Sequence, residues 1–382
     1  MVAVLGAAFC MKIHRKKIKR ELLRVVNQIN SWIMNVYEPL IRWQRKRDAG
    51  RTLNVQINPA HSCSDKVAVY LVFQPHGLTA STLLTLEHLQ SKGYSTLLVS
   101  NCPLSVEDSA RTLALCWQVM VRKNFGYDFG GYQDGVLAVM RSDQPVKQML
   151  ILNDSIWFPL HRDCDLLDRM EASPVGFVGA FQLEPTRDQK KMRGKRRPFM
   201  GSFFWHFKDP VLSSPAFKEF WRDYKATSSK FATIRRGERR FTHHLMDAGI
   251  ACDAIFSRSQ FDSWLQHAQG TELRQALEDL CTNDSHLATR RLALLASYQS
   301  HPTWEANARA LASAITRSQN IMATAPLFMV RDLGLPFLKK SADDANLLAL
   351  QALNTYFSKR PELIGKSVLN ELRQVLQRHQ AK

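Results

Sequence analysis

The sequence predicts an α/β fold built on a mostly parallel central sheet. In the first half of the chain, short apolar runs bounded by turn residues alternate with stretches of helical periodicity. Residues 67–100 fit a strand, a helix and a second strand into about 30 residues, the size of a right-handed βαβ unit. Polar motifs directly follow two of the apolar runs, and open α/β sheets bind ligands at that end of their strands.

Seven apolar runs are expected to form the strands of this sheet. They are residues 67–73, 94–100, 117–122, 148–152, 175–181, 200–207 and 250–256. The helices expected near them are residues 78–92, 132–141, 215–224 and 238–248. Two of these helices are directly followed by glycine, the residue that most often ends a helix. Strands that alternate with helices indicate a parallel sheet.

Beyond residue 262 the composition changes to Ala, Leu, Gln and Arg at helical spacing. We therefore expect three regions: a basic amphipathic helical region over residues 1–60, the sheet domain over 61–262, and a mainly helical region over 263–382 that packs on it. The stretch 325–340 has too many apolar residues to remain exposed, so we expect it to lie against the sheet domain.

The chain is strongly basic, with a net charge of +18 and an isoelectric point near 9.8. Half of this charge comes from residues 1–51, which hold 12 Lys and Arg against three acidic residues. Residues 187–197 add seven basic residues in a stretch that we expect to be an exposed loop. An excess of this size indicates an anionic partner, which includes nucleic acid, an acidic membrane surface or a phosphorylated substrate.

The basic residues near the N-terminus accompany an apolar stripe. Between residues 12 and 47, apolar side chains recur every three or four positions from Ile18 to Val36. One interpretation is a solvated helix packed on the domain. The other is reversible attachment to the anionic inner face of a cell membrane.

Cysteine use and the opening residues indicate the compartment. The seven cysteines form no C-x-x-C pair and are odd in number, which favours a reducing environment. The apolar run over residues 1–11 is too short to span a bilayer and lacks the flanks of a cleaved signal. We therefore expect a cytoplasmic protein, peripherally associated with the membrane if the N-terminal stripe binds lipid.

The first candidate site is Asn153-Asp154-Ser155, directly after the apolar run 148–152. A carboxylate at a strand end can bind a divalent cation, Mg²⁺ or Mn²⁺, that bridges a diphosphate. Asp154 is the candidate ligand. Asp and Ser also commonly cap turns and helices, so a purely structural role is the alternative.

The second candidate site runs from Asn124 through Gly126, Tyr127 and Asp128 to Gly130, with Gly131 after it. Glycines permit turns and close approach of a ligand, and amide groups at a helix start suit phosphate or sugar hydroxyls. The alternative is a glycine-rich loop with an Asn cap. The glycine spacing differs from that of the dinucleotide-binding fingerprint.

Two further residues are candidates for roles in the site. Glu238 opens an expected helix and could act as a general base on a hydroxyl, or simply complement the helix N-terminus. Asn101 ends the strand 94–100 on the same predicted edge of the sheet and could hold a nucleotide.

The order of motifs resembles that of a known family. The segments VYLVFQPHG, STLLVSN, RKNFGYDFGGYQDG and LILNDSIWFPL resemble the rhamnan-synthesis F family of bacterial polysaccharide glycosyltransferases. The likeness covers residues 66–260, and more weakly 320–342. N-x-G-Y-D-x-G followed by L-N-D-S is its specific part. The family often has a Gln-Ser pair before the aromatic strand, where this chain has Met200-Gly201-Ser202.

This resemblance implies a GT-A-like nucleotide-sugar-binding fold. The N-G-Y-D-G segment would border the donor site, and the N-D-S segment would stand where related transferases carry a D-x-D-type metal site. Here that segment offers a single carboxylate, Asp154.

The resulting hypothesis is a glycosyltransferase that moves rhamnose or another deoxyhexose from a nucleotide-diphosphate donor. The acceptor would be a growing cell-surface polysaccharide or lipopolysaccharide glycan, lipid-linked or as an oligosaccharide. Asp154 would anchor the diphosphate, Glu238 would be the base, and Asp128 is the second candidate for that role. The competing hypothesis is a basic nucleic-acid-binding protein without catalytic activity. It is disfavoured because the basic runs lack stacking aromatics and no helix-turn-helix or RNA-binding motif is present.

Overall fold

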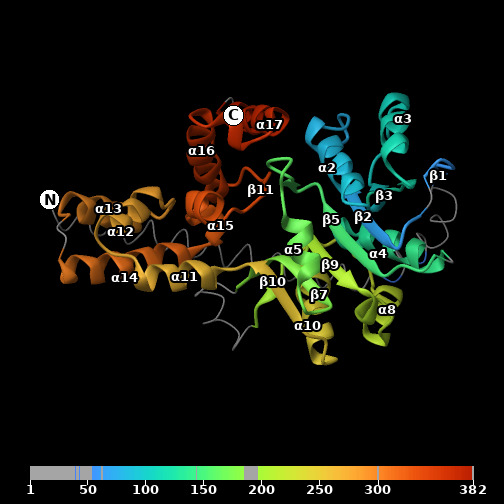
Figure 1. Cartoon of the computed structure of the whole chain (residues 1–382), viewed down its shortest axis with the longest axis horizontal. Helices are drawn as coiled ribbons and strands as arrows, with labels where there is room; N and C mark the ends of the chain where they lie inside the picture. The colour runs from blue at the N-terminus through green and yellow to red at the C-terminus, as the bar shows by residue number, and fades with distance from the viewer. Residues whose placement is uncertain are drawn as a thin grey trace.

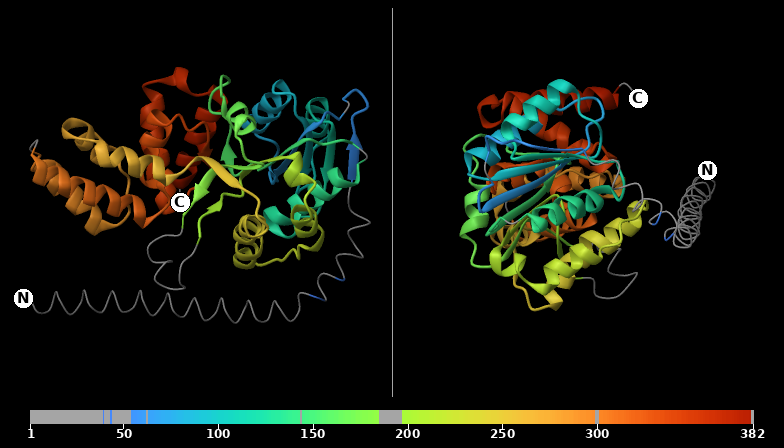
Figure 2. Two further views of the ribbon diagram at one scale, coloured as in Figure 1. Left: turned by 60° about the horizontal axis from the view of Figure 1, so that its bottom comes forward. Right: turned by 90° about the vertical axis from the view of Figure 1, so that its right-hand side faces the viewer.

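The structure is a computed structural model that describes residues 39, 43, 54–61, 63–142, 144–184, 197–298 and 301–380. A central sheet lies between two layers of helices, and a long helical region extends from one end of it (Figures 1 and 2). Six of the eight main strands of the sheet run in the same direction. The predicted α/β class with a mostly parallel sheet is therefore confirmed.

The order of the main strands in the sheet is β1-β4-β3-β2-β5-β9-β7-β10. Their bounds are β1 Asn54–Ile57, β2 Lys66–Val72, β3 Ser95–Ser100, β4 Gln118–Val121, β5 Gln148–Asn153, β7 Phe177–Leu183, β9 Phe204–Lys208 and β10 Cys252–Phe256. β1 and β9 run antiparallel to their neighbours, and β8 (Phe199–Met200) adds a short antiparallel pair to β7. The six remaining strands end at one common edge.

Strand alternation explains why both faces of the sheet are covered. In β2, Val69 and Leu71 belong to one buried cluster, whereas Tyr70 and Val72 belong to the other. The first cluster includes residues of α4 (Tyr127–Arg141), α8 (Pro215–Asp223) and α10 (Arg240–Asp247). The second includes residues of α2 (Ala80–Ser91) and α5 (Leu166–Ala172), and α3 (Val106–Leu115) packs against α2.

The chain leaves β10 into the helical region that follows the sheet. Its helices are α11 Arg258–His267, α12 Gly270–Asp279, α13 Ser285–Ala296, α14 Pro302–Ser318, α15 Ile321–Thr324, α16 Asp344–Ser358 and α17 Lys366–Gln380. Two short elements, the π-helix η2 (Phe328–Asp332) and β11 (Leu338–Lys339), lie between α15 and α16. The division into three domains remains a prediction.

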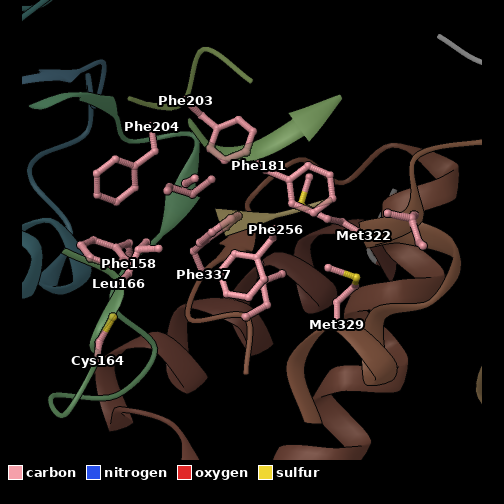
Figure 3. Close-up of a cluster of buried hydrophobic side chains, with 14 of the residues drawn as sticks. Phe158, Cys164, Leu166, Phe181, Phe203, Phe204, Phe256, Met322, Met329 and Phe337 are labelled. Carbon is pink, nitrogen blue, oxygen red and sulfur yellow. The ribbon is translucent and has the colours of Figure 1, made fainter. Parts of the chain in front are cut away.

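The stretch that contains η2 and β11 lies against the sheet domain. β11 pairs antiparallel with β6 (Ile156–Trp157), directly after the N-D-S motif. Phe337 packs between Phe203 and Phe256, with ring centroids 5.4 Å and 6.2 Å away (Figure 3). Segments far apart in the sequence therefore share one apolar cluster beside the sheet edge.

Three sequence-based expectations differ from the structure in detail. The expected strand 200–207 is interrupted, because Gly201 turns the chain between β8 and β9. The helix expected from residue 132 begins at Tyr127, so most of the glycine-rich motif is helical. The π-helix η1 (Ile234–Arg239) precedes α10, so Glu238 does not begin that helix.

The two basic stretches singled out in the sequence fall largely outside the described residues. Of residues 12–47 the structure describes only Pro39 and Trp43, and of residues 187–197 only Arg197. Within the described ranges, no helix has both the length and the apolar character needed to span a bilayer.

Candidate active site

The predicted site residues gather at the edge of the sheet where its parallel strands end. β2, β3 and β5 are adjacent and parallel, so Val72, Ser100 and Asn153 end at the same side. β9 is antiparallel, and the loop that carries Ser202 into it reaches this edge as well. The topology thus brings the N-D-S motif, Asn101 and the loop before β9 together.

Asp154 is held firmly by the neighbouring strand end. Its backbone N–H donates to the carbonyl of Leu71 at 3.0 Å. Its Oδ2 accepts hydrogen bonds from the Phe73 N–H and from Gln74 Nε2, both at 3.0 Å. Among the described residues nothing donates to Oδ1, so one carboxylate oxygen is fixed in place and still available to a ligand.

Asn153 links Asp154 to the second motif. Its Nδ2 donates to Asp128 Oδ2 at 3.2 Å, and its Oδ1 accepts from the Ser155 N–H at 3.1 Å and the Ser155 hydroxyl at 2.6 Å. The side chain of Asn153 is buried, with 4% of its surface exposed. Asn153 and Ser155 therefore brace the two carboxylates of the site, and their role as donor-binding residues remains a prediction.

The glycine-rich motif is a tight turn into α4. Gly126 has a φ of 81° and Tyr127 a φ of 51°, the left-handed region that non-glycine residues rarely adopt. Tyr127 is 42% exposed, and Asp128 follows it in the first turn of α4. Asn124 is exposed just before the turn. The turn presents Tyr127 and Asp128 at the sheet edge.

The glycines within α4 have a packing explanation that the sequence did not reveal. A Cβ on Gly130 would lie 2.1 Å from the Phe125 carbonyl oxygen, and one on Gly131 would lie 2.3 Å from Leu71 Cδ1. Both residues are buried against the turn and β2. Close packing of α4 against the turn and against β2 thus accounts for these glycines, and contact of Gly130 with a donor remains only a prediction.

Asn101 is connected to the glycine turn through Arg122, a residue that the sequence analysis missed. Its buried Oδ1 accepts from Arg122 Nη1 at 2.5 Å. The same guanidinium donates to Asp134 Oδ2 at 2.6 Å and to the carbonyl of Phe125 at 2.8 Å. Arg122 therefore ties the ends of β3 and β4 to the glycine turn. A basic residue directly after an apolar strand was the available signal.

Glu238 reaches the site from the π-helix η1. Its Oε1 accepts from the Ser202 N–H at 3.1 Å and from the Ser202 hydroxyl at 3.0 Å. These bonds attach η1 to the loop before β9, the segment where the chain departs from the family pattern. The carboxylate is partly buried and faces the same group of charges as Asp128.

Two lysines from the C-terminal stretch complete the site. Lys339 Nζ lies 3.5 Å from the centroid of the Phe203 ring. The negative charges of Glu238 and Asp128 both favour its protonated form. Lys340 Nζ donates to Ser81 Oγ at 3.2 Å and lies 4.0 Å from Glu371. The Lys-Lys pair after an apolar stretch was visible in the sequence, but only the β6–β11 pairing brings it to the site.

The surroundings change the proton affinity of two of these groups in opposite directions. Desolvation raises the pKa of Asp128 to about 6, with Lys339 lowering it and the charges of Asp154 and Glu238 raising it. Desolvation lowers the pKa of Lys339 to about 8 against the effect of Glu238 and Asp128. Asp128 nevertheless keeps an exposed side chain, so it lies at the protein surface rather than in the core.

The donor set fits a divalent cation of the magnesium type. No three His, Cys, Asp or Glu side chains converge as a ready cage within the described part of the chain. Magnesium typically needs only one or two carboxylates and takes its other ligands from substrate phosphate and water. Asp154, with its open Oδ1, is the residue that would hold such an ion.

Comparison with solved structures finds glycosyltransferases, at low similarity. Core-mannan synthase A of Aspergillus fumigatus, in its Mn/GDP form, is 11% identical with a TM-score of 0.31, over 49% of this chain and 71% of that one. A Drosophila β-1,4-galactosyltransferase 7 mutant, in complex with manganese, UDP-Gal and xylobiose, is 13% identical with a TM-score of 0.27, over 50% and 64%.

Sequence relatives extend over more of the chain. An uncharacterised protein of Sinorhizobium fredii, y4gN, is 28% identical over 373 residues, which are 96% of this chain and 91% of that protein. Residues 96–276 match the family model of rhamnan synthesis protein F, which confirms over that segment the family resemblance predicted from the motifs.

Proposed function

We propose that this protein is a glycosyltransferase of polysaccharide biosynthesis with a GT-A-like fold. It would transfer a sugar, rhamnose or another deoxyhexose, from a nucleotide-diphosphate donor to a growing cell-surface or lipopolysaccharide glycan. The observation that carries the proposal is the convergence of Asp154, Asp128 and Glu238 at the edge where the parallel strands end. The match to rhamnan synthesis protein F supports it.

The donor diphosphate would lie beside Asp154. When bound there, a Mg²⁺ or Mn²⁺ ion would neutralise charge that develops on the leaving diphosphate. The first amide groups of α4 point to the same edge and favour an anion. Lys339 adds a cation that is already partly desolvated, which strengthens its interaction with a phosphate oxygen.

Asp128 is the better of the two candidate bases. A general base works best when its pKa lies near the working pH, and the pKa of Asp128 is raised to about 6. Glu238 is fixed by two hydrogen bonds from Ser202, which suit a residue that orients the acceptor. We therefore assign proton removal from the acceptor hydroxyl to Asp128 and positioning to Glu238, the reverse of the order expected from the sequence.

The acceptor would be lipid-linked or an oligosaccharide. For a lipid-linked acceptor, the protein would work at the cytoplasmic face of the membrane. Residues 12–47 supply basic and apolar residues for reversible attachment to an anionic surface, where each Lys or Arg contributes roughly 1 kcal/mol. The basic residues 187–197 would provide a second contact or receive a phosphorylated acceptor.

A donor screen tests the function. The full chain is incubated with a panel of nucleotide sugars, with Mg²⁺, with Mn²⁺ or with chelator, and donor hydrolysis and transfer to short oligosaccharides are measured. We expect turnover of at least one deoxyhexose donor, lost in Asp154→Asn and kept in Asp253→Asn, an exposed carboxylate on β10. No turnover of any donor, together with salt-dependent binding to nonspecific DNA, would favour the nucleic-acid hypothesis instead.

A further inference from the structure

A recess lies in the helical region, outside the candidate active site. It has a volume of about 460 Å³, within the usual range of roughly 300–1,000 Å³ for small-molecule sites. Its walls come from α11, α12 and η2. Phe261, Trp264 and Phe328 form an aromatic group in it, with ring centroids 4.9 to 5.7 Å apart. Trp264 is the partly exposed member, and the other two are buried.

The polar groups of the recess are fixed by their own contacts. Arg331 donates through Nη1 to Asp279 Oδ2 at 2.8 Å, and through Nε and Nη2 to the two oxygens of Asp332, both at 2.8 Å. Gln275 Nε2 donates to Asp279 Oδ1 at 2.9 Å. The guanidinium is thus held between two carboxylates. The carboxylate oxygens therefore form a rigid row of hydrogen-bond acceptors. These side chains lose little entropy when a ligand binds.

Two groups at the recess still have unused hydrogen-bonding capacity. Within the described residues, neither the Trp264 indole N–H nor the Glu272 carboxylate makes a hydrogen bond or an ion pair. Glu272 is exposed and lines the recess from the first turn of α12. An aromatic face beside a free donor and several acceptors matches a molecule with both apolar C–H faces and hydroxyls.

The charge of the recess identifies the ligand class further. Three carboxylates, Glu272, Asp279 and Asp332, line it against one guanidinium, in a chain whose net charge is +18. Local negative charge disfavours nucleotides and phosphorylated compounds. We propose that this recess binds a neutral sugar unit of the acceptor glycan, at a distance from the reacting end. This inference rests on the proposed glycosyltransferase function and extends it to acceptor selection.

The topology connects the recess with the active site. η2 lines the recess through Phe328, Arg331 and Asp332, and the chain then runs to Lys339 at the active site. Seven residues span at most about 25 Å, so an oligosaccharide of several units can reach both places. α11 also leaves directly from the strand-end edge through β10. An acceptor would therefore gain affinity from the recess only when it is long enough to reach from the active site to the recess.

An acceptor-length series tests this. Transfer onto rhamnose oligosaccharides from the disaccharide to the octasaccharide is measured with the full chain and saturating donor, and octasaccharide binding is measured without donor by calorimetry. Three variants alter the recess: Thr271→Trp fills it from an exposed position, Trp264→Ala removes the aromatic face, and Glu272→Gln removes a charge. Glu278→Gln is the matched control, because it lies on the same helix, is exposed and pairs with Arg274 outside the recess.

The wild type and Glu278→Gln should use the octasaccharide with a KM about tenfold below that of the disaccharide. Thr271→Trp and Trp264→Ala should lose most of that advantage and Glu272→Gln part of it, and all three should leave disaccharide turnover unchanged. Equal length dependence in the wild type and Thr271→Trp overturns the inference and leaves the transferase function intact. If the protein transfers no sugar but binds the octasaccharide, and Thr271→Trp abolishes that binding, the recess is supported and the transferase function is refuted.

Discussion

The protonation state of Asp128 gives the sharpest prediction for the pH dependence of the reaction. Its pKa is raised to about 6, and a base must be deprotonated to act. At pH 5, one unit below that value, about a tenth of the molecules carry the active form. The value of kcat/KM should therefore fall about tenfold from its plateau at pH 5, rise through pH 6 and level off near pH 7.

Lys339 provides an internal check on this assignment. Its positive charge lowers the pKa of Asp128, so Lys339→Met should move the acidic limb of the profile to higher pH. The pKa of Lys339 itself is lowered to about 8, so the wild type should lose activity above that pH as the ammonium loses its proton. Lys339→Met should lack this alkaline limb and show a lower plateau.

The assay is initial-rate transfer to a short soluble acceptor between pH 4.5 and 9, with circular dichroism at each pH to exclude unfolding. Asp128→Asn should lower kcat by on the order of 10²-fold or more, and Asp253→Asn, an exposed residue, should not. A profile that is flat from pH 5 to 7 would refute the reasoning. So would an Asp128→Asn variant with near-normal kcat, and the base would then be Glu238.

The remaining predictions concern the donor site, the packing of α4 and the N-terminus. Asp154→Asn should cut turnover by at least about 10²-fold with an unchanged melting temperature, and normal turnover would remove Asp154 from the donor site. Gly131→Ala should destabilise the fold by roughly 1–3 kcal/mol, since its Cβ would lie 2.3 Å from Leu71 Cδ1; Gly365→Ala, with no contact under 3.6 Å, is the control in thermal unfolding. Deleting residues 1–47 should weaken co-sedimentation with anionic vesicles but spare activity on a soluble acceptor; undiminished binding would show that the attachment lies elsewhere.

The sheet was predictable because its strands are local patterns. Residues 148–152 and 94–100 are short apolar runs with clear boundaries, and they form β5 and β3 nearly as expected. Their parallel pairing with β2 follows from the helices between them. The placement of Asp154 at the sheet edge follows in turn, since it comes directly after β5.

The rest of the site depends on long-range contacts that no local pattern encodes. Lys339 reaches it only because β11 pairs with β6, nearly two hundred residues earlier in the chain. For the glycines of the N-G-Y-D-G motif the pattern predicts a turn and leaves a glycine-rich loop as the alternative, because sequence alone cannot distinguish a glycine needed for a turn from one needed for packing. Gly126 has the positive φ of a turn, whereas Gly131 lies in a helix against Leu71.

The two π-helices suggest how the parts of the site are combined. η1 brings Glu238 to the loop before β9, and η2 precedes the segment that brings Lys339 to the same place. π-helical turns are rare, because they widen a helix at a cost in stability. Those that do occur are frequently found at functional sites. Here both of them lie on connections between the helical segments and the active-site edge. The helical region is then not an appendage of the sheet domain, because its C-terminal stretch supplies Lys339 to the candidate active site and its helices line the recess that we propose for the acceptor. Removing it should cost catalysis as well as stability.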